Sequence, residues 1–344
     1  MKRLSSLISA GLQPLRNLAA SISRRMSRLQ IDAHRRGRFA RTPFAMPWLG
    51  WKDIVARTWE QIFNDRLLSV AAGVAFFALL ALVPSLSVML TVFALVADPA
   101  QIEVQLAPLV GLMPDTAATL VMDQAHRLAQ QAASQPMSLT LIVSLAIALW
   151  SANAGIQALF DALNVIYDED EKRSFLALNA LSLAITLGAA VVLIVVVGLV
   201  TVLPVVVAKL PFAAAFEGSV ALLRWPTFLV LVTAALAVLF WIGPSRRRAR
   251  FVWVLPGAAL AALLWALVSA LFNLYVSRLG SYDVAYGSLS AVIVLMTWLW
   301  LSATAILIGA ELNAELEHQT MRDTTEGPPK PIGARGARRA DAIG

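Results

Sequence analysis

Long apolar segments alternate with shorter polar segments along this chain of 344 residues. Most of the apolar segments reach the roughly 20 residues that cross the hydrocarbon of a bilayer as a helix. Strands are not expected in them, because an unpaired strand in lipid leaves its backbone groups unsatisfied. The pattern predicts an all-α, polytopic membrane protein with six transmembrane helices, at residues 69–96, 138–160, 176–208, 226–242, 253–276 and 288–309. Pro84 lies inside the first of these and predicts a helix kink.

The polar segments divide the chain into three parts. Residues 1–66 are expected to form a basic cytoplasmic segment, partly amphipathic or disordered, and 67–318 the six-helix domain. Residues 319–344 are rich in Pro, Gly and charge, which predicts a disordered cytoplasmic tail. Between spans, apolar residues at helical spacing within 98–136 predict an amphipathic surface helix, and 209–225 a second short surface segment.

Composition and charge support this class and add an orientation. Apolar residues make up 59% of the chain and charged residues only 14%, too few to cover a soluble domain of this size. Of the 28 Lys and Arg, 24 lie in 1–66, 161–175, 243–252 and the part after 309. This positive-inside bias places both termini in the cytoplasm. With no cysteine in the chain, a bacterial inner membrane is the expected location.

Two basic stretches allow more than one reading. The arginines of residues 1–52 alternate with apolar residues, so this stretch is an interfacial segment attracted to anionic lipid, an RNA-binding arm, or a disordered topology determinant. A tighter cluster between the fourth and fifth spans either contacts lipid headgroups or simply fixes topology. It consists of Arg246, Arg247, Arg248 and Arg250.

Polar residues inside the membrane are costly, and they are therefore the first candidates for function. Asn153, Gln157 and Asp161 are spaced four residues apart on the second span, and Asn164 follows, so they form one stripe. We expect this stripe to line a cavity, although Asn and Gln also hydrogen-bond between packed helices. Two further groups join the candidates: Glu311 and Asn313 at the cytoplasmic end of the sixth span, and Asn273, Tyr282 and Tyr286 near the outer face.

Motifs for metal, nucleotide or covalent chemistry are missing from the sequence, so no cofactor is expected. The histidines are His34, His126 and His318, too far apart to form a shared zinc site. The acidic run 168–171 could suggest a metal, but Lys172 and Arg173 follow at helical spacing and favour a self-paired, solvated turn.

Three stretches resemble the YihY/BrkB family of bacterial inner-membrane proteins, long mislabelled as ribonuclease BN. They read AAGVAFFALLALVPSL at 71–86, LWSANAGIQALFDALNVIYDEDEKRSF at 149–175 and YGSLSAVIVLMTWLWLSATAILIGAELNAELE at 286–317. The resemblance implies a six-helix inner-membrane protein, with relatives tied to serum resistance or proposed to move lipids or lipid-linked precursors. It supplies no catalytic residues. On the matching positions it draws attention to Pro84, Asn153, Asp161, Asn164, Tyr286, Gly287, Glu311 and Asn313.

Three functions are therefore compared. The first is a transporter or translocase of lipids or other amphiphilic, anionic envelope compounds, with anionic membrane lipids as partners and no nucleic acid. The second is a non-catalytic membrane scaffold for envelope biogenesis, and the least favoured is a membrane-tethered ribonuclease. Small residues on the fifth span, including Gly257 and Ala261, permit close helix packing within one chain or in a homo-oligomer.

Overall fold

The computed structural model describes residues 30–94, 119, 122–123, 126, 139–208, 213–279 and 289–344. Within this part the regular structure is helical, with one isolated antiparallel bridge between Ala249 and Thr325. The α-helices are α2 (Trp48–Asn64), α3 (Leu67–Ala94), α6 (Leu139–Ile166), α7 (Phe175–Ala208), α8 (Ala213–Ile242), α9 (Leu255–Leu279), α11 (Ser290–Gln319) and α12 (Arg338–Asp341). The 3₁₀ turns η1 (Pro43–Ala45) and η3 (Phe251–Trp253) precede α2 and α9.

The predicted all-α class agrees with these elements. Two helical stretches of the described part, Phe251–Arg278 and Ser290–Gln319, are long and apolar enough to cross a membrane. A third candidate is the pair Trp48–Asn64 and Leu67–Leu82, which bends by 64° at its break, and shorter apolar helices cover Phe175–Ala189 and Pro226–Ile242.

Several element boundaries differ from the sequence-based prediction. Residues 213–225, expected on the surface, form the first part of α8, which continues through Pro226. The last helix ends at Gln319 instead of 309, because its polar end is covered by other parts of the chain. The helix α3 continues through Pro84, whose predicted kink stays a prediction. The surface helix expected within 98–136 falls almost entirely outside the described residues.

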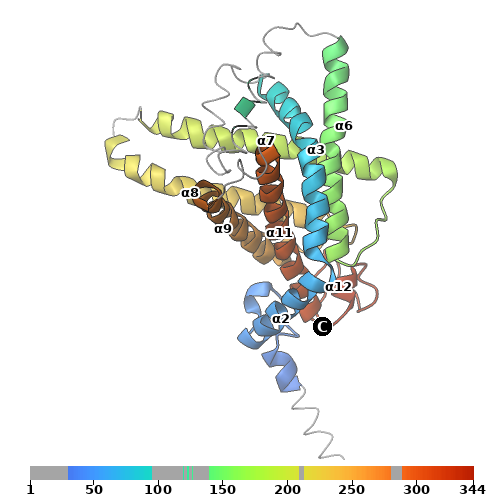
Figure 1. The fold of residues 1–344 in the computed structure, drawn as a ribbon. Coiled ribbons are helices and arrows are strands. Elements are labelled where there is room, and N and C mark those ends of the chain that lie inside the picture. Colours follow the sequence, from blue (N-terminus) through green and yellow to red (C-terminus); the bar gives the residue numbers. More distant parts are fainter. Residues whose placement is uncertain are drawn as a thin grey trace, which may run out of the picture.

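The helices pack around α11, which contacts α9, α3, α2 and α6 (Figure 1). The pair α9 and α11 approaches closely at two glycines: a methyl group on Gly257 would lie only 2.0 Å from the carbonyl oxygen of Gly309. Asn313 closes the same crossing, because its side chain accepts from the Gly257 N–H (2.8 Å) and donates to the Val254 carbonyl (2.9 Å). The small residues of the fifth predicted span therefore serve packing within the chain, and Asn313 is a helix-packing residue.

The C-terminal segment folds back on the end of the bundle that also carries α2 (Figure 1). Backbone bonds tie it to the loop before α9, from Arg250 N to Thr324 O (2.8 Å) and from Arg247 N to Gly336 O (2.9 Å). The Arg335 side chain, only 3% exposed, donates to the carbonyls of Met321 (2.6 Å) and Ala340 (2.5 Å). Residues 319–344 are therefore folded onto the bundle, whereas their composition predicted disorder. The difference arises because these buried hydrogen bonds satisfy the backbone of the segment.

Candidate functional site

The polar end of α11 is the most unusual feature of the described residues. Five polar side chains there are fully buried: Glu311, Asn313, Glu315, Glu317 and Gln319. Each turn of the helix end contributes at least one of them, and α2 and the C-terminal segment cover them. A buried carboxylate is very costly unless it is paired, so each one raises the question of its partner.

Glu317 has a complete set of partners. Both of its carboxylate oxygens accept from Arg246, at 2.7 Å each, and one also accepts from the Thr324 hydroxyl at 3.1 Å. The Arg246 guanidinium lies over the Tyr167 ring, 4.0 Å from its centroid. Burial alone would lower the pKa of Arg246, but the facing Glu317 carboxylate raises it overall. This bidentate, stacked pair fixes the loop before α9 to the end of α11.

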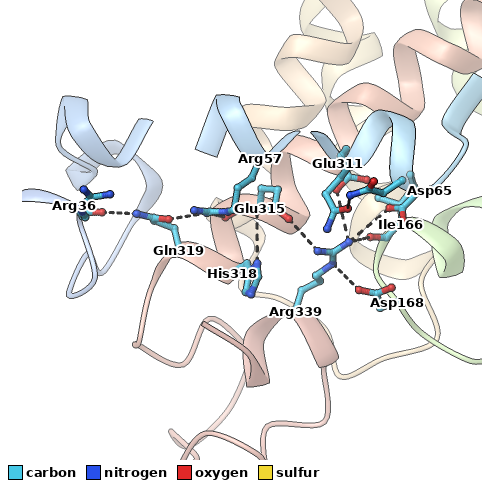
Figure 2. A network of polar contacts seen from close by, with 12 residues as sticks. Arg36, Arg57, Asp65, Ile166, Asp168, Glu311, Glu315, His318, Gln319 and Arg339 are labelled. Carbon is cyan, nitrogen blue, oxygen red and sulfur yellow. Dashed lines mark hydrogen bonds and ion pairs between the residues drawn. The ribbon is translucent and has the colours of Figure 1, made fainter. Parts of the chain in front are cut away.

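Arg339, on α12, lies at the centre of a second group of carboxylates (Figure 2). Its guanidinium is 2.9 Å from Glu315, 3.1 Å from Asp168, 3.6 Å from Asp65 and 3.8 Å from Glu311. These four acids come from α11, the loop after α6 and the break between α2 and α3. One side chain of the C-terminal segment thus connects three separate parts of the bundle.

Glu315 has a second cationic partner on α2. The Arg57 Nε lies 2.5 Å from the Glu315 carboxylate, and Arg57 also donates to the Gln319 side chain at 2.6 Å. Gln319 in turn donates to the Arg36 carbonyl at 2.7 Å, which continues the network to the residues before α2 (Figure 2). His318 adds a ring nitrogen 3.5 Å from Glu315.

Carboxyl groups outnumber guanidinium groups in this network. Four carboxyl groups face the two guanidinium groups of Arg339 and Arg57, and Glu311 is the least satisfied of the four. It is 0% exposed and neither of its carboxyl oxygens has a hydrogen-bond partner. Burial raises the pKa of Glu311 to about 9, so its carboxyl group is protonated at neutral pH and avoids the cost of an unbonded buried charge.

The polar stripe of α6 is divided into two parts. Asn153 and Gln157 both donate to the side-chain oxygen of Asn179 on α7, at 3.0 and 2.7 Å. Asn164 instead accepts from the Ser245 N–H (2.7 Å) and donates to Glu171 (3.0 Å), while Asp161 is exposed. These are contacts between helices and loops, and the cavity expected along the stripe stays a prediction.

The acidic run 168–171 pairs with the tail as well as with its own neighbours. Lys172 contacts Glu169 and Arg173 contacts Glu171, each at 2.6 Å. The partners are thus three and two residues apart, whereas the sequence-based prediction paired residues four apart. Asp168 and Asp170 instead pair with Arg339 and Arg338. Among the residues that the structure describes, no group of three or more His, Asp or Glu side chains could hold a metal ion.

The basic cluster before α9 is only partly available to lipid. Arg246 is buried in its pair with Glu317, which removes it from the headgroup candidates because a buried guanidinium cannot reach the membrane surface. Arg247 donates to the carbonyls of Glu326 and Pro328 in the tail. Arg248 and Arg250 are exposed, and for these two residues contact with lipid headgroups stays a prediction. Of the outer polar group, Asn273 is half-buried on α9, whereas Tyr282 and Tyr286 lie outside the described residues.

Sequence reasoning missed several members of the site. Asn179, Arg57, Asp65 and Arg339 were not singled out, although each now has a defined polar partner. Asn179 carried a usable signal, since it is a lone amide near the start of an apolar helix. Arg339 carried none, because its partners lie 24 or more residues away and its local sequence resembles a flexible tail.

Comparison with known proteins identifies the family. The family described as Virulence factor BrkB matches residues 58–332, which include all the helices from α3 to α11. The chain belongs to the BrkB family. This confirms the resemblance to the YihY/BrkB family.

Individual BrkB relatives agree with this assignment. The ribonuclease-like protein YfkH of Bacillus subtilis (strain 168) is 34% identical over 269 residues, covering 76% of this chain and 93% of YfkH. A UPF0761 membrane protein of Aromatoleum aromaticum is 30% identical over 76% of this chain, which spans 64% of that protein's length. Another, from Rhodospirillum centenum, is 29% identical over 85% of this chain and 64% of its own length. No solved structure matches the chain. The BrkB assignment and the apolar helices together make this chain a membrane protein.

Proposed function

We propose that this BrkB protein crosses the bacterial inner membrane six times, with both termini in the cytoplasm, and moves lipids or other amphiphilic, anionic compounds. The six-span topology is supported by the agreement between the predicted spans and helices α3, α6, α7, α8, α9 and α11. The orientation is supported by the 24 of 28 Lys and Arg on one side. The buried ion pairs of Arg246 and Arg339 then lie at the cytoplasmic end.

The observation that carries the transport proposal is the amide cluster between α6 and α7. Asn153, Gln157 and Asn179 bring polar groups together between two largely apolar helices. The side-chain oxygen of Asn153 is buried without a hydrogen-bond partner, so one acceptor is left over. A headgroup that enters the hydrocarbon must exchange its bonds to water for bonds to protein. Amides that can exchange partners supply such bonds without burying a fixed charge.

The test is a translocation assay in liposomes of phosphatidylethanolamine and phosphatidylglycerol that contain a fluorescent phosphatidylglycerol. Dithionite bleaches the outer leaflet, and the later loss of inner-leaflet fluorescence reports translocation. We expect the wild-type protein to accelerate this loss and the double variant Asn153→Leu/Gln157→Leu to abolish the acceleration. Thr233→Val is the matched control, since this hydroxyl on α8 bonds only its own helix at Leu229. A fully active double variant would refute the role of the amides.

The same liposome assay distinguishes the scaffold function from the transport function. A scaffold acting through free tails would leave translocation at the background rate, while a cell phenotype would follow the tails. The folded tail weakens this alternative, because residues 319–344 are engaged with the bundle itself. The name of YfkH keeps a membrane-tethered ribonuclease as the third candidate, which RNA cleavage by the purified protein would support.

A further inference from the structure

The helix α2 has two different faces. Its inner face is packed: Ile54 is 0% and Thr58 7% exposed, and a methyl group on Gly50 would lie 2.6 Å from the Arg36 carbonyl oxygen. This face contacts α11, and Arg57 extends from the same helix to Glu315. The position of α2 on the bundle is therefore fixed, and its outer face has a defined direction.

The outer face of α2 carries large apolar side chains that are exposed. Trp48 is 78%, Val55 58%, Trp59 65% and Phe63 60% exposed. The spacings of seven and four residues place all four on one side of the helix. Trp59 and Phe63 contact each other edge to face, with ring centroids 5.3 Å apart. An exposed stripe of this size on a soluble surface would be a liability, so it requires an apolar environment.

The geometry of the bend sets the orientation of α2 relative to the membrane. Between α2 and α3 the chain turns by 64°, at Asp65 and at Arg66, whose φ is +49°. The helix α3 is apolar and also exposes large side chains, Phe76 (48%) and Leu80 (56%), as expected for contact with acyl chains. If α3 crosses the membrane, a helix turned by 64° from it lies closer to the membrane plane than to the membrane normal. The helix α2 thus has the orientation of an interfacial helix.

Charge near the stripe favours an anionic surface. Lys52 lies in the middle of the stripe and is exposed, as are Arg41 before α2 and Arg66 after it. A lysine there can extend its ammonium group to the headgroups while its stem remains among apolar atoms. In the sequence before the described part, residues 1–29 contain six Lys and Arg and no Asp or Glu. Each basic residue near an anionic membrane surface contributes about 1 kcal/mol of attraction.

We infer that α2 lies in the boundary between headgroups and acyl chains, with Trp48, Val55, Trp59 and Phe63 inserted into an anionic leaflet. The lipid surface is therefore a bound partner of α2 and fixes the depth of the helix. Through Arg57 and Glu315, the same helix connects this surface to the buried network at the end of α11. The inference rests on the membrane location of the protein and is independent of any transport activity.

The absence of native cysteine makes a direct test available. Single cysteines at Val55 or Phe63 would be labelled with an environment-sensitive NBD dye in the full chain, reconstituted in phosphatidylethanolamine–phosphatidylglycerol liposomes. Asn64→Cys is the matched control, because Asn64 is exposed on the same helix but lies about 180° around its axis from Val55 and about 100° from Phe63. We expect strong quenching by lipids with a shallow nitroxide and weak quenching by iodide at positions 55 and 63, with the reverse at position 64.

Two results would overturn the inference. Iodide access at positions 55 and 63 equal to that at position 64 would show that α2 lies in water. Protection from iodide together with cysteine cross-linking between two chains, at position 55 or 63 in dilute liposomes, would show that a second copy covers the stripe. All three substituted side chains are exposed, so unchanged melting of the variants is expected and serves as the folding control.

Discussion

Arg339 places its guanidinium 2.9 Å from the Glu315 carboxylate, with Arg339 only 5% and Glu315 0% exposed. Removing one partner of such a buried pair leaves the other charge uncompensated, which typically costs about 3–5 kcal/mol. We therefore expect Arg339→Ala to lower the melting temperature strongly in detergent, followed by the intrinsic fluorescence of the tryptophans. Arg338→Ala is the control: its pair with Asp170 is exposed on both sides and should contribute about 1 kcal/mol or less. Equal effects of the two variants would contradict this account.

Glu311 and Glu315 lie one helical turn apart and should respond differently to the same substitution. Glu315→Gln weakens bonds to Arg57 and Arg339, each of which is charge-assisted and contributes roughly 1.5–3 kcal/mol. Burial raises the pKa of Glu311 to about 9, so its carboxyl is protonated at neutral pH. Glu311→Gln then replaces one neutral group that has no hydrogen-bond partner by another, and stability should be unchanged or higher. Thermal melts of the two variants measure the difference. A Glu311 variant as unstable as the Glu315 variant would mean that Glu311 has a partner of its own.

Gly257→Ala tests the close approach of α9 and α11. The added methyl group would meet the Gly309 carbonyl oxygen at 2.0 Å, so the two helices must separate and the Asn313 bonds must lengthen. Overpacking of this kind costs about 1–3 kcal/mol. Gly188→Ala on α7 is the matched helix substitution, since nothing lies within 4 Å of its added methyl group. It should stabilise the protein by about 0.5–1 kcal/mol. Both values can be obtained from equilibrium unfolding, and a harmless Gly257 variant would rule out the tight crossing.

Glu171 makes stability depend on pH. Hydrogen bonds from Arg173, and then from Asn164, lower its pKa from 4.5 to about 2 in the folded state. A depressed carboxyl pKa contributes stability that is present above the unfolded pKa and is lost as pH falls from 4.5 toward about 2. Wild type should therefore melt higher than Glu171→Gln at neutral pH, and the gap should narrow at about pH 3. A difference in melting temperature that does not change with pH would contradict the lowered pKa of Glu171.

The helices were largely predictable because the thickness of the bilayer imposes a length on every apolar segment. The ends of the helices were not. Glu311, Glu315 and Glu317 look like loop residues in the sequence, and only the arginines that cover them allow α11 to continue to Gln319. Arg246 comes from the loop before α9 and Arg339 from a Pro/Gly-rich tail, where composition predicts disorder and no local periodicity indicates a partner.

The amide stripe illustrates a second limit. Helical spacing placed Asn153, Gln157 and Asn164 on one face of α6, and all three make polar contacts from that helix. Spacing could not show that the first two meet Asn179 while the third holds a loop, because this depends on how far α7 extends along α6. Periodicity gives the direction of a side chain but not the identity of its partner.

The burial of Arg339 also has a consequence for synthesis. Arg57 leaves the ribosome early and Glu315 late, but the α12 segment with Arg339 is made after every other described helix. Until that segment emerges, the acidic end of α11 has only some of the arginine partners that it has in the folded protein. A chain broken off before residue 339 would therefore insert its helices and still leave Glu311 and Glu315 without the guanidinium group that Arg339 supplies.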